Sequence, residues 1–581
     1  MSEIAWDREV DLLVIGGGAA GMTTALVAAL EGLQPLLVEK SAQVGGTMST
    51  SAGTIWIPGN QPSREAGYAD TVQAAAVYMD QLIGRPDSDG LRSAYLATGP
   101  DVVDYLHCKS EVRFVPSGKH PDYRELPGAA VSGRALAPAP FDGRLLGKDF
   151  ERVRPPIPEF MVLGGMMAGK DDIPRLIHRF KSVGNFCYAG RLFLRYLGDR
   201  LRYSRGTRVV MGNALAARLF YSLKKREVPV LFDSTVQDLV REGGRVAGAV
   251  LRTPGGTVRV KARKGVVIAT GGYGHNARLR KQFMPAPTPP YTVACPTNTG
   301  DGIELGLRHG GVVRPETQGP GAFWTPVSVT RRADGSQGVF PHLSLDRAKP
   351  GLIAVNGAAQ RFVNEAASYH DFVQGMYASH RSVPTLPACL VCEAAFVARY
   401  GLGNVHPGTT DLRKAEREGY LVTAPTLEAL ARKLQLDPAA LQATVLRYNA
   451  LARSGKDTDF GKGDTELNRF NGDPAQQPNP CLRPIEQGPF VGLAVWPAEI
   501  GTSTGLVTDA DGQVLDAQGQ AVAGLYACGN DMASVMAGSY PGPGTTLGPA
   551  LTFGYRVAMH AAGRPAGRTG SPQGERPVAM A

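Results

Sequence analysis

A glycine-rich turn near the start of the chain, in VDLLVIGGGAAGMTTALVAALEGLQPLLVEK, constrains the fold more than any other feature. Val10 to Ile15 is continuously apolar, as expected for a strand that is covered on both faces. Gly16, Gly18 and Gly21 then form GxGxxG and lead into a helical pattern. In such a unit the first glycine makes the turn, the second lets the backbone approach a pyrophosphate, and the third lets the helix pack on the strand. The sequence therefore predicts a dinucleotide-binding domain of the Rossmann-like α/β class.

The segments that follow this turn favour FAD as the nucleotide. A second apolar run, PLLVEK, ends in Glu39, where a carboxylate can hold the ribose hydroxyls. The next segment, SAQVGGTMSTSAG, resembles the pyrophosphate and isoalloxazine loop of FAD enzymes related to fumarate reductase and succinate dehydrogenase. Covalent members of that superfamily carry a histidine in this loop, whereas Met48, Ser49 and Thr50 stand here. The resemblance therefore implies FAD bound without a covalent link.

Four further segments resemble flavin-contacting segments of the same superfamily, in the same order: FDSTVQDLV, KGVVIATGGYG, NTGDG and LYACGND. The first corresponds to the strand beside the adenine, and the last to the strand that reaches the ribityl chain. Together with the first turn and loop, the resemblance implies the following cofactor-binding residues: Gly16, Gly18, Ala20, Gly21, Glu39, Lys40, Gly45, Gly46, Thr47, Ser51, Ala52, Gly53, Val236, Gly271, Gly272, Asn298, Gly300, Asp301, Gly529, Asn530 and Leu547.

The spread of these segments predicts how the domains are arranged. We expect a discontinuous FAD-binding domain of the glutathione-reductase-like α/β class at 1–320 and 493–567, with an inserted α+β catalytic or cap domain at 321–492. The last fourteen residues, 568–581, are rich in Gly, Pro, Ser and Arg and predict a disordered tail. The CxxC in PACLVCEAAF lies in an apolar run and predicts a buried strand, so no metal site is expected.

An insertion at about 150–215 differs in composition from the rest of the chain. Between 175 and 208 it carries nine Lys or Arg and one acid, Asp199. A helix through 188–203 would place Leu194, Leu197 and Leu201 on one stripe, which is typical of a helix lying on an anionic membrane surface. The alternative is a helix that covers the FAD-binding domain with its arginines in solvent. We expect a cytoplasmic protein, because the start shows no signal pattern. If the helix lies on a membrane, the protein also contacts that membrane peripherally.

The net charge of +10 also permits a nucleic-acid partner. The alternative is an FAD-containing RNA-binding or RNA-modifying protein, which predicts aromatic side chains arranged for base stacking. The 7% aromatic content and the lack of an RNA-binding motif disfavour it. We therefore expect no nucleic-acid partner.

The segment SYPGPGTTLGPALTFGY, near the C-terminal end, contains residues that we expect to bind the substrate. Pro541 and Pro543 fix φ and lack N–H groups, so the turn is stiff. The phenol of Tyr540 and the amide of Gly544 flank this turn and can together hold one carbonyl oxygen. Two donors on an oxygen that gains charge stabilise an enolate, so the turn predicts a site for a ketone.

The longer stretch YACGNDMASVMAGSYPGPGTTLGPALTFGY resembles the C-terminal signature of the 3-ketosteroid Δ1-dehydrogenases. The resemblance covers most of the chain and is closest to the longer members, which act on cholest-4-en-3-one-type ketones. It implies that Tyr540 and Gly544 hold the 3-keto oxygen. It also implies that Tyr369, which follows RFVNE, takes the C2 proton with help from Tyr123, while the C1 hydride passes to flavin N5.

Other functions stay open at this point. They are a Δ4-(5α)-dehydrogenase, another ketone-directed flavin dehydrogenase, and a fumarate-reductase-like enoate reductase. The last is disfavoured because Tyr369 stands where those relatives usually have arginine, and GTSTGL lacks their usual histidine. The substrate is a C19 steroid, a side-chain sterol, a bile acid or a non-steroid cyclic ketone, and a quinone or a carrier protein is the expected electron acceptor.

Overall fold

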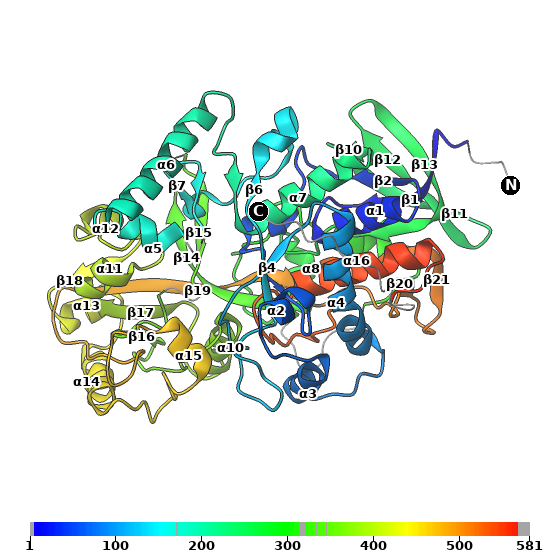
Figure 1. The fold of residues 1–581 in the computed structure, drawn as a ribbon. Coiled ribbons are helices and arrows are strands. Elements are labelled where there is room, and N and C mark those ends of the chain that lie inside the picture. The colour runs from blue at the N-terminus through cyan, green and yellow to red at the C-terminus, as the bar shows by residue number, and fades with distance from the viewer. Residues whose placement is uncertain (1–4, 170–171, 314–320, 333, 344–345, 568–581) are drawn as a thin grey trace.

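Two large β-sheets organise the molecule, which we describe from a computed structural model (Figure 1). The described residues are 5–169, 172–313, 321–332, 334–343 and 346–567. The predicted tail at 568–581 lies outside them.

The first sheet contains the predicted nucleotide-binding unit. Its strands are β10 (Val230–Leu231), β2 (Pro35–Val38), β1 (Arg8–Ile15), β13 (Gly256–Ile268), β12 (Arg245–Thr253), β11 (Thr235–Glu242), β20 (Gln513–Leu515) and β21 (Ala521–Ala527). The run β10–β2–β1–β13–β21 is parallel, and β12 and β11 extend it as an antiparallel pair. Helix α1 (Ala19–Leu30) packs against α16 (Leu547–Ala561) and α7 (Met211–Lys225). This arrangement confirms the predicted strand–turn–helix–strand unit and the Rossmann-like α/β class.

The second sheet forms the other lobe in Figure 1. Its strands are β15 (Gln337–Pro341), β14 (Ala322–Arg331), β19 (Phe490–Thr502), β17 (Ala388–Glu393), β16 (Leu352–Val355) and β18 (Val422–Ala424). Strand β17 contains the CxxC, which confirms the predicted buried strand. The lobe also contains α13 (Leu427–Lys433) and α14 (Pro438–Ser454), and Asp437 caps α14. Strand β19 runs through the predicted boundary at 492/493, and the domain boundaries stay a prediction.

The insertion forms a separate projection above β14 and β15 in Figure 1. It contains β7 (Met161–Val162), β8 (Met166–Met167), α5 (Asp172–Ile177) and α6 (Val183–Arg200). The predicted helix is therefore present, although it begins five residues before 188 and ends three before 203. Only Tyr196 and Asp199 of α6 are buried, so its leucine stripe does not cover the FAD-binding sheet. Within the described residues, no helix combines the length and the apolar character needed to cross a bilayer.

The remaining helices and strands are shorter or lie around the two sheets, and some carry site residues. They are β3 (Ile55–Trp56), β4 (Phe114–Pro116), β5 (Ala135–Pro138), β6 (Phe141–Asp142), β9 (Arg208–Val209), α2 (Gln61–Glu65), α3 (Val72–Ile83), α4 (Leu91–Lys109), α8 (Ala277–Phe283), α9 (Asp301–Arg308), α10 (Tyr369–His380), α11 (Ala394–Tyr400), α12 (Arg413–Arg417) and α15 (Glu466–Asn471).

Candidate active site

The glycine turn after β1 has two tightly packed glycines and one open one. A Cβ on Gly16, whose φ is +108°, would lie 2.2 Å from the carbonyl oxygen of Ala269. A Cβ on Gly21 would lie 1.9 Å from the carbonyl oxygen of Gly16. A Cβ on Gly18 would meet no atom within 4 Å, because Gly18 lines a cavity of about 640 Å³. Gly18 also precedes α1 without a capping side chain, so the first amides of the helix are open to a phosphate.

This difference predicts opposite outcomes for two substitutions in one turn. We expect Gly18→Val to lower FAD affinity at least about tenfold while the fold persists, because the new side chain fills ligand space only. We expect Gly21→Ala to cost about 1–3 kcal/mol of stability, because its methyl group strikes backbone. Flavin content and the melting temperature of the flavin-stripped proteins measure the two effects separately. Full flavin content in Gly18→Val would exclude this turn as the pyrophosphate site.

Glu39 and Lys40 lie at the end of β2, where the sequence places them. The Glu39 carboxylate accepts from the amides of Gly17 (2.8 Å) and Ser41 (2.9 Å). Lys40 pairs with Asp301 at 2.8 Å. Most of the predicted cofactor residues line the same cavity, Val236, Asn530 and Leu547 among them.

Three of the predicted cofactor residues, Gly21, Gly272 and Gly300, do not line the cavity, and their role toward FAD stays a prediction. Gly21 packs α1 on the turn. Gly272 donates to Asp531 at 3.3 Å, and a Cβ there would lie 2.0 Å from Thr502 Oγ1. Gly300 precedes α9 and donates to the Gly272 carbonyl at 3.1 Å. Because they have no side chain, these glycines allow the backbone to pack closely behind the segments that line the cavity.

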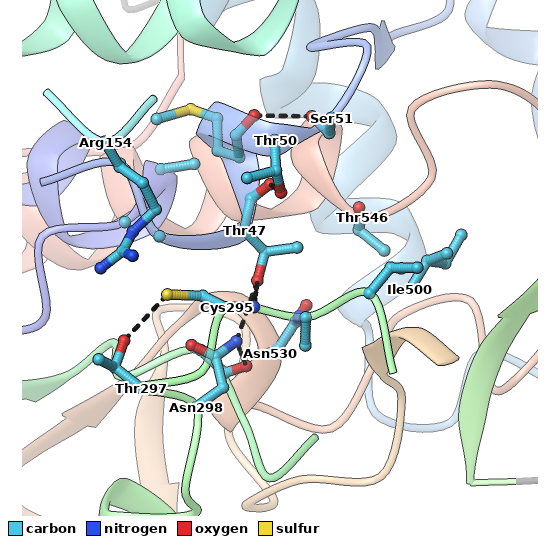
Figure 2. A pocket seen from close by; sticks show the side chains of 18 of the residues that line it. Thr47, Thr50, Ser51, Arg154, Cys295, Thr297, Asn298, Ile500, Asn530 and Thr546 are labelled. Carbon is cyan, nitrogen blue, oxygen red and sulfur yellow. Dashed lines mark hydrogen bonds between the residues drawn. The ribbon is translucent and has the colours of Figure 1, made fainter. Parts of the chain in front are cut away.

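Figure 2 shows the hydrogen bonds between the loop at 45–53 and the loop at 295–298. Thr47 Oγ1 accepts from the Cys295 amide at 2.8 Å and from Asn298 Nδ2 at 3.1 Å. Asn298 Nδ2 also donates to the Gly271 carbonyl at 2.9 Å. Thr47 therefore fixes the position of both cavity walls relative to each other.

Arg154 is a cavity residue that the sequence did not reveal (Figure 2). Its Nη2 donates to Ser41 Oγ at 3.1 Å, and its Nε is buried without a hydrogen-bond partner among the described residues. A phosphate oxygen would satisfy this donor. Arg154 lies in the insertion, outside every recognised motif, so no local signal marked it. The open Gly18, the ordered carboxylate and this unpartnered donor together fit FAD.

Three tyrosines from distant parts of the chain meet in the same cavity. Tyr123 lies in the loop between β4 and β5, Tyr369 begins α10, and Tyr540 precedes α16. Tyr123 Oη donates to Tyr369 Oη at 3.0 Å, and Tyr369 Oη donates to Tyr540 Oη at 2.9 Å. The rings of Tyr123 and Tyr540 stack, with centroids 5.5 Å apart, and Tyr369 stands edge-on to both. The structure thus brings together all three predicted tyrosines.

The surroundings of this cluster are apolar and uncharged on the side of Tyr540. Burial raises the pKa of Tyr123, Tyr369 and Tyr540 well above the usual value. Burial also lowers the pKa of His370, whose ring lies 5.5 Å from that of Tyr540, to about 4. His370 is therefore neutral near pH 7.

Gly544 faces the cavity with its backbone. Its φ is +99°, and a Cβ would lie 2.5 Å from the carbonyl oxygen of Thr54, so only glycine fits without a shift. Its carbonyl accepts from the amides of Trp56 (3.4 Å) and Gly548 (3.0 Å). In the described part of the chain, neither the Gly544 N–H nor the hydroxyl hydrogen of Tyr540 donates to another residue. Both residues line the cavity, so both donors are available to a ligand.

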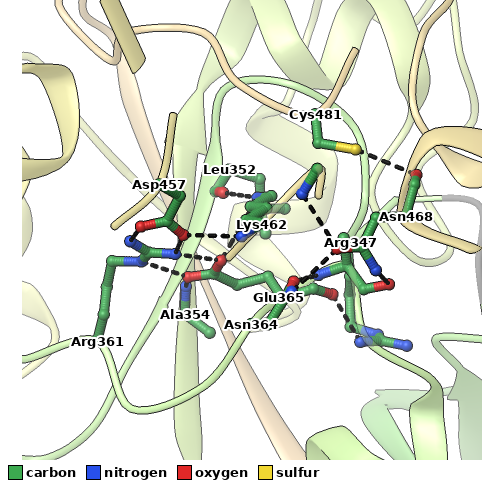
Figure 3. A network of polar contacts seen from close by, with 12 residues as sticks. Arg347, Leu352, Ala354, Arg361, Asn364, Glu365, Asp457, Lys462, Asn468 and Cys481 are labelled. Carbon is green, nitrogen blue, oxygen red and sulfur yellow. Dashed lines mark hydrogen bonds and ion pairs between the residues drawn. The ribbon is translucent and has the colours of Figure 1, made fainter. Parts of the chain in front are cut away.

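The RFVNE motif before Tyr369 has a structural role (Figure 3). Arg361 donates to Glu365 through two 2.8 Å bonds and to Asp457 at 2.7 Å. Lys462 Nζ lies 3.6 Å from Glu365 and donates to the Leu352 carbonyl at 2.6 Å. All four charged side chains are at most 4% exposed. Removing one partner of such a buried group is costly, so the network fixes the loop that carries Tyr369.

Apolar side chains also line the cavity. They include Phe160, Val339, Pro341, Leu343 and Ile500. Lys40, Arg154 and Arg332 are the lysine and arginine residues among the described ones that line the cavity. Arg332 is engaged by Glu159, with Nε–Oε1 at 2.9 Å and Nη2–Oε2 at 3.1 Å.

Comparisons with known proteins agree with this geometry. The family model described as "FAD binding domain" matches residues 11–547. The chain is 38% identical to the 4-oxocyclohex-2-ene-1-carboxylate 5-dehydrogenase of Sinomonas cyclohexanicum, over 96% of this chain and 95% of that protein. It is 35% identical to the 3-oxosteroid 1-dehydrogenase of Mycobacterium tuberculosis H37Rv, over 96% and 98%.

A solved structure is also similar over nearly the whole chain. It is the 3-ketosteroid Δ1-dehydrogenase of Sterolibacterium denitrificans in complex with 1,4-androstadiene-3,17-dione. The sequence identity is 35% and the TM-score is 0.88, and the match covers 96% of this chain and all of that one.

Proposed function

We propose that this chain, which belongs to the FAD binding domain family, is an FAD-dependent oxidoreductase that forms the C1–C2 double bond of a 3-ketosteroid. Within that family it belongs to the group of the 3-oxosteroid 1-dehydrogenases. The observation that supports this most is the hydrogen-bonded set Tyr123, Tyr369 and Tyr540 beside the available Gly544 N–H. These groups share one cavity with the nucleotide turn.

The proposed chemistry assigns one task to each group. Tyr540 Oη and the Gly544 amide donate to the ketone oxygen and so acidify the C2–H. Tyr369 acts as a phenolate, after releasing its own hydroxyl proton to solvent, and its Oη takes the C2 proton. The hydroxyl of Tyr123, 3.0 Å away, donates to that phenolate and stabilises its negative charge. The electron pair of the broken C2–H bond becomes the π bond between C1 and C2 as C1 loses a hydride. FAD, when bound, accepts that hydride.

A neutral ring ketone suits this cavity better than a ketone that carries a carboxylate. The cavity wall as a whole is mainly apolar, and Arg332, one of its arginines, is already paired with Glu159. The second candidate is a cyclic keto-acid, as in the name of the Sinomonas relative. The observation that favours it is Arg332, because this guanidinium would bind a carboxylate if it were released from Glu159.

Anaerobic mixing of the holoenzyme with each compound tests this choice. We expect 4-androstene-3,17-dione to bleach the flavin at least about tenfold faster than 4-oxocyclohex-2-ene-1-carboxylate, because an apolar wall leaves a carboxylate unpaired. Arg332→Gln is expected to leave the steroid reaction unchanged. Bleaching by the keto-acid alone, abolished in Arg332→Gln, would establish the second candidate instead.

We also propose that the projection formed by α5 and α6 rests on an anionic lipid bilayer. Its apolar side chains are exposed rather than packed, and they alternate with exposed basic residues, so both features suit a membrane surface. The exposed apolar residues are Ile173, Ile177, Phe180, Val183, Phe186, Phe193, Leu194, Leu197 and Leu201. The exposed basic residues are Arg175, Arg179, Lys181, Arg191, Arg200 and Arg202.

Vesicle flotation tests this contact. The double variant Leu194→Glu/Leu201→Glu is expected to lose at least about tenfold in binding to phosphatidylglycerol vesicles, since acidic groups oppose both apolar and electrostatic attraction. Leu446→Glu, a control at an equally exposed leucine (71%) of α14, should bind as the parent does. Binding that is equal in all three proteins contradicts the proposal.

A quinone or an electron-carrier protein is the acceptor that we propose for reoxidation. The chain carries one dinucleotide turn between a strand and a helix, and FAD accounts for it. A bilayer contact would also bring the protein close to membrane quinones.

A further inference from the structure

The loop at 117–134, between β4 and β5, carries Tyr123 and is anchored to β3 and to the turn before α16. The carboxylate of Asp122 accepts from Trp56 Nε1 of β3 at 2.8 Å. The Tyr123 amide donates to the Pro541 carbonyl at 2.9 Å. Because Pro541 belongs to the turn before α16, these contacts hold Tyr123 against the proposed ketone-binding turn.

Arg124, the next residue in the chain, connects the same loop to α10. Its Nη2 donates to Asp371 Oδ1 at 2.6 Å, and its Nε donates to Oδ2 at 3.4 Å. Asp371 lies two residues after Tyr369, in the first turn of α10, and α10 packs against β14 of the second sheet. Ser368 Oγ, which caps α10, also donates to Asp371 Oδ2 at 2.9 Å. The cap therefore orients the carboxylate that Arg124 binds.

The bonds of Asp122 and Arg124 bring two distant segments together on either side of Tyr123. Across the same gap, the Tyr123 and Tyr369 hydroxyls lie 3.0 Å apart. A guanidinium that binds a carboxylate through two nitrogens fixes orientation as well as distance. The ion pair therefore determines how the two hydroxyls meet, and a displacement of about 1 Å in such a site costs up to about 10²-fold in rate.

We propose that Arg124 and Asp371 are positioning residues for the dehydrogenation, whose ion pair holds the Tyr123 hydroxyl where it can donate to the Tyr369 phenolate. This inference rests on the proposed function, because it presumes that Tyr369 is the base. Neither Arg124 nor Asp371 is among the described residues that line the cavity, so the pair acts through Tyr123 and not on the steroid.

The first test is Arg124→Gln in the holoenzyme, with anaerobic flavin bleaching by 4-androstene-3,17-dione as the readout. We expect the maximal rate to fall about fivefold or more, because Tyr123 no longer meets the phenolate squarely. The half-saturating steroid concentration should stay within about twofold, since no contact with the steroid is lost. Arg124→Lys keeps the charge but not the two-nitrogen geometry, and should recover part of the rate. The Arg124 side chain is 51% exposed, so the fold should persist in both variants.

Combination with Tyr123→Phe separates positioning from a general structural role. If Arg124 acts through the Tyr123 hydroxyl, the double variant Arg124→Gln/Tyr123→Phe should react within about twofold of Tyr123→Phe alone, because the two changes remove one interaction. A structural role independent of that hydroxyl would multiply the two losses. Lys119→Gln is the matched control: it removes another ion pair of the same loop, Lys119–Glu466 at 2.8 Å, at a similarly exposed side chain (55%). Lys119→Gln should react at the parental rate.

Asp371→Asn gives a second measurement of the same pair and keeps an oxygen for the Ser368 contact. It should show the loss seen in Arg124→Gln, and it decides alone if Arg124→Gln does not retain FAD. Parental rates in both variants, or a loss that persists in full in the Tyr123→Phe background, would overturn the proposal. A slow Tyr369→Phe beside parental Arg124→Gln and Asp371→Asn refutes this proposal alone, whereas a Tyr369→Phe enzyme at the parental rate refutes the proposed base as well.

Discussion

Replacement of Tyr369 by phenylalanine is expected to slow flavin bleaching by a 3-ketosteroid at least about 10³-fold while FAD stays bound, because general-base catalysis contributes about 10²–10⁴-fold. The hydroxyl of Tyr369 lies between those of Tyr123 and Tyr540, so its loss removes the proton acceptor and interrupts both hydrogen bonds. The ring keeps its edge-on contacts, and the α10 start is capped by Ser368, so the fold should persist. Anaerobic stopped-flow absorbance measures the rate.

Two further variants separate this effect from a general loss of activity. Tyr377→Phe removes a hydroxyl from the same helix and should react like the parent. Among the described residues, that hydroxyl bonds only the Pro287 carbonyl, at 3.5 Å. Tyr123→Phe removes the outer hydroxyl of the set and should cost about 10–100-fold, since hydrogen bonds to a charged group are worth about 1.5–3 kcal/mol. A Tyr369→Phe enzyme that reacts at the rate of Tyr377→Phe would rule out the proposed base.

Features set by short-range chemistry could be predicted from the sequence. Gly21 must be glycine because a Cβ there would strike the nearby Gly16 carbonyl, and β1, α1 and β2 flank the turn as predicted. Asp437 before a proline marks the start of α14 because such a residue caps a helix. Tyr540 and Gly544 share one turn, so their proximity also followed from the sequence.

Features that depend on packing between distant segments could not be predicted in this way. Arg154 reaches the cavity from an insertion and lies in no motif. Its position depends on the bridge between Val153 and the distant Val44 and on its bond to Ser41 Oγ, which local propensity does not determine. Likewise, the pattern of α6 predicts an apolar stripe, but it does not say whether protein, lipid or water covers it.

The last site prediction concerns the oxygen of the ketone. Tyr540→Phe is expected to lower the rate of bleaching about 10²–10³-fold, because one donor to a developing oxyanion is worth about 2.7–4 kcal/mol. The effect should fall mainly on the maximal rate rather than on the half-saturating steroid concentration, since the negative charge on the oxygen grows toward the transition state. The Tyr540 ring would keep its edge contact with Phe323 (5.4 Å between centroids), so Tyr369 should stay in place.

Gly544→Ala tests the second donor without removing any hydroxyl. At a φ of +99° and 2.5 Å from the Thr54 oxygen, the new methyl group must displace the turn and its amide. We expect a loss of rate of about 10²-fold or more, with both phenols intact. Tyr555→Phe, on α16 and outside the cavity, serves as the matched control and should leave the rate unchanged. If Tyr540→Phe and Gly544→Ala both react at the parental rate, the ketone oxygen is held elsewhere, and Tyr369 loses the acidified C2–H on which its proposed role as base depends.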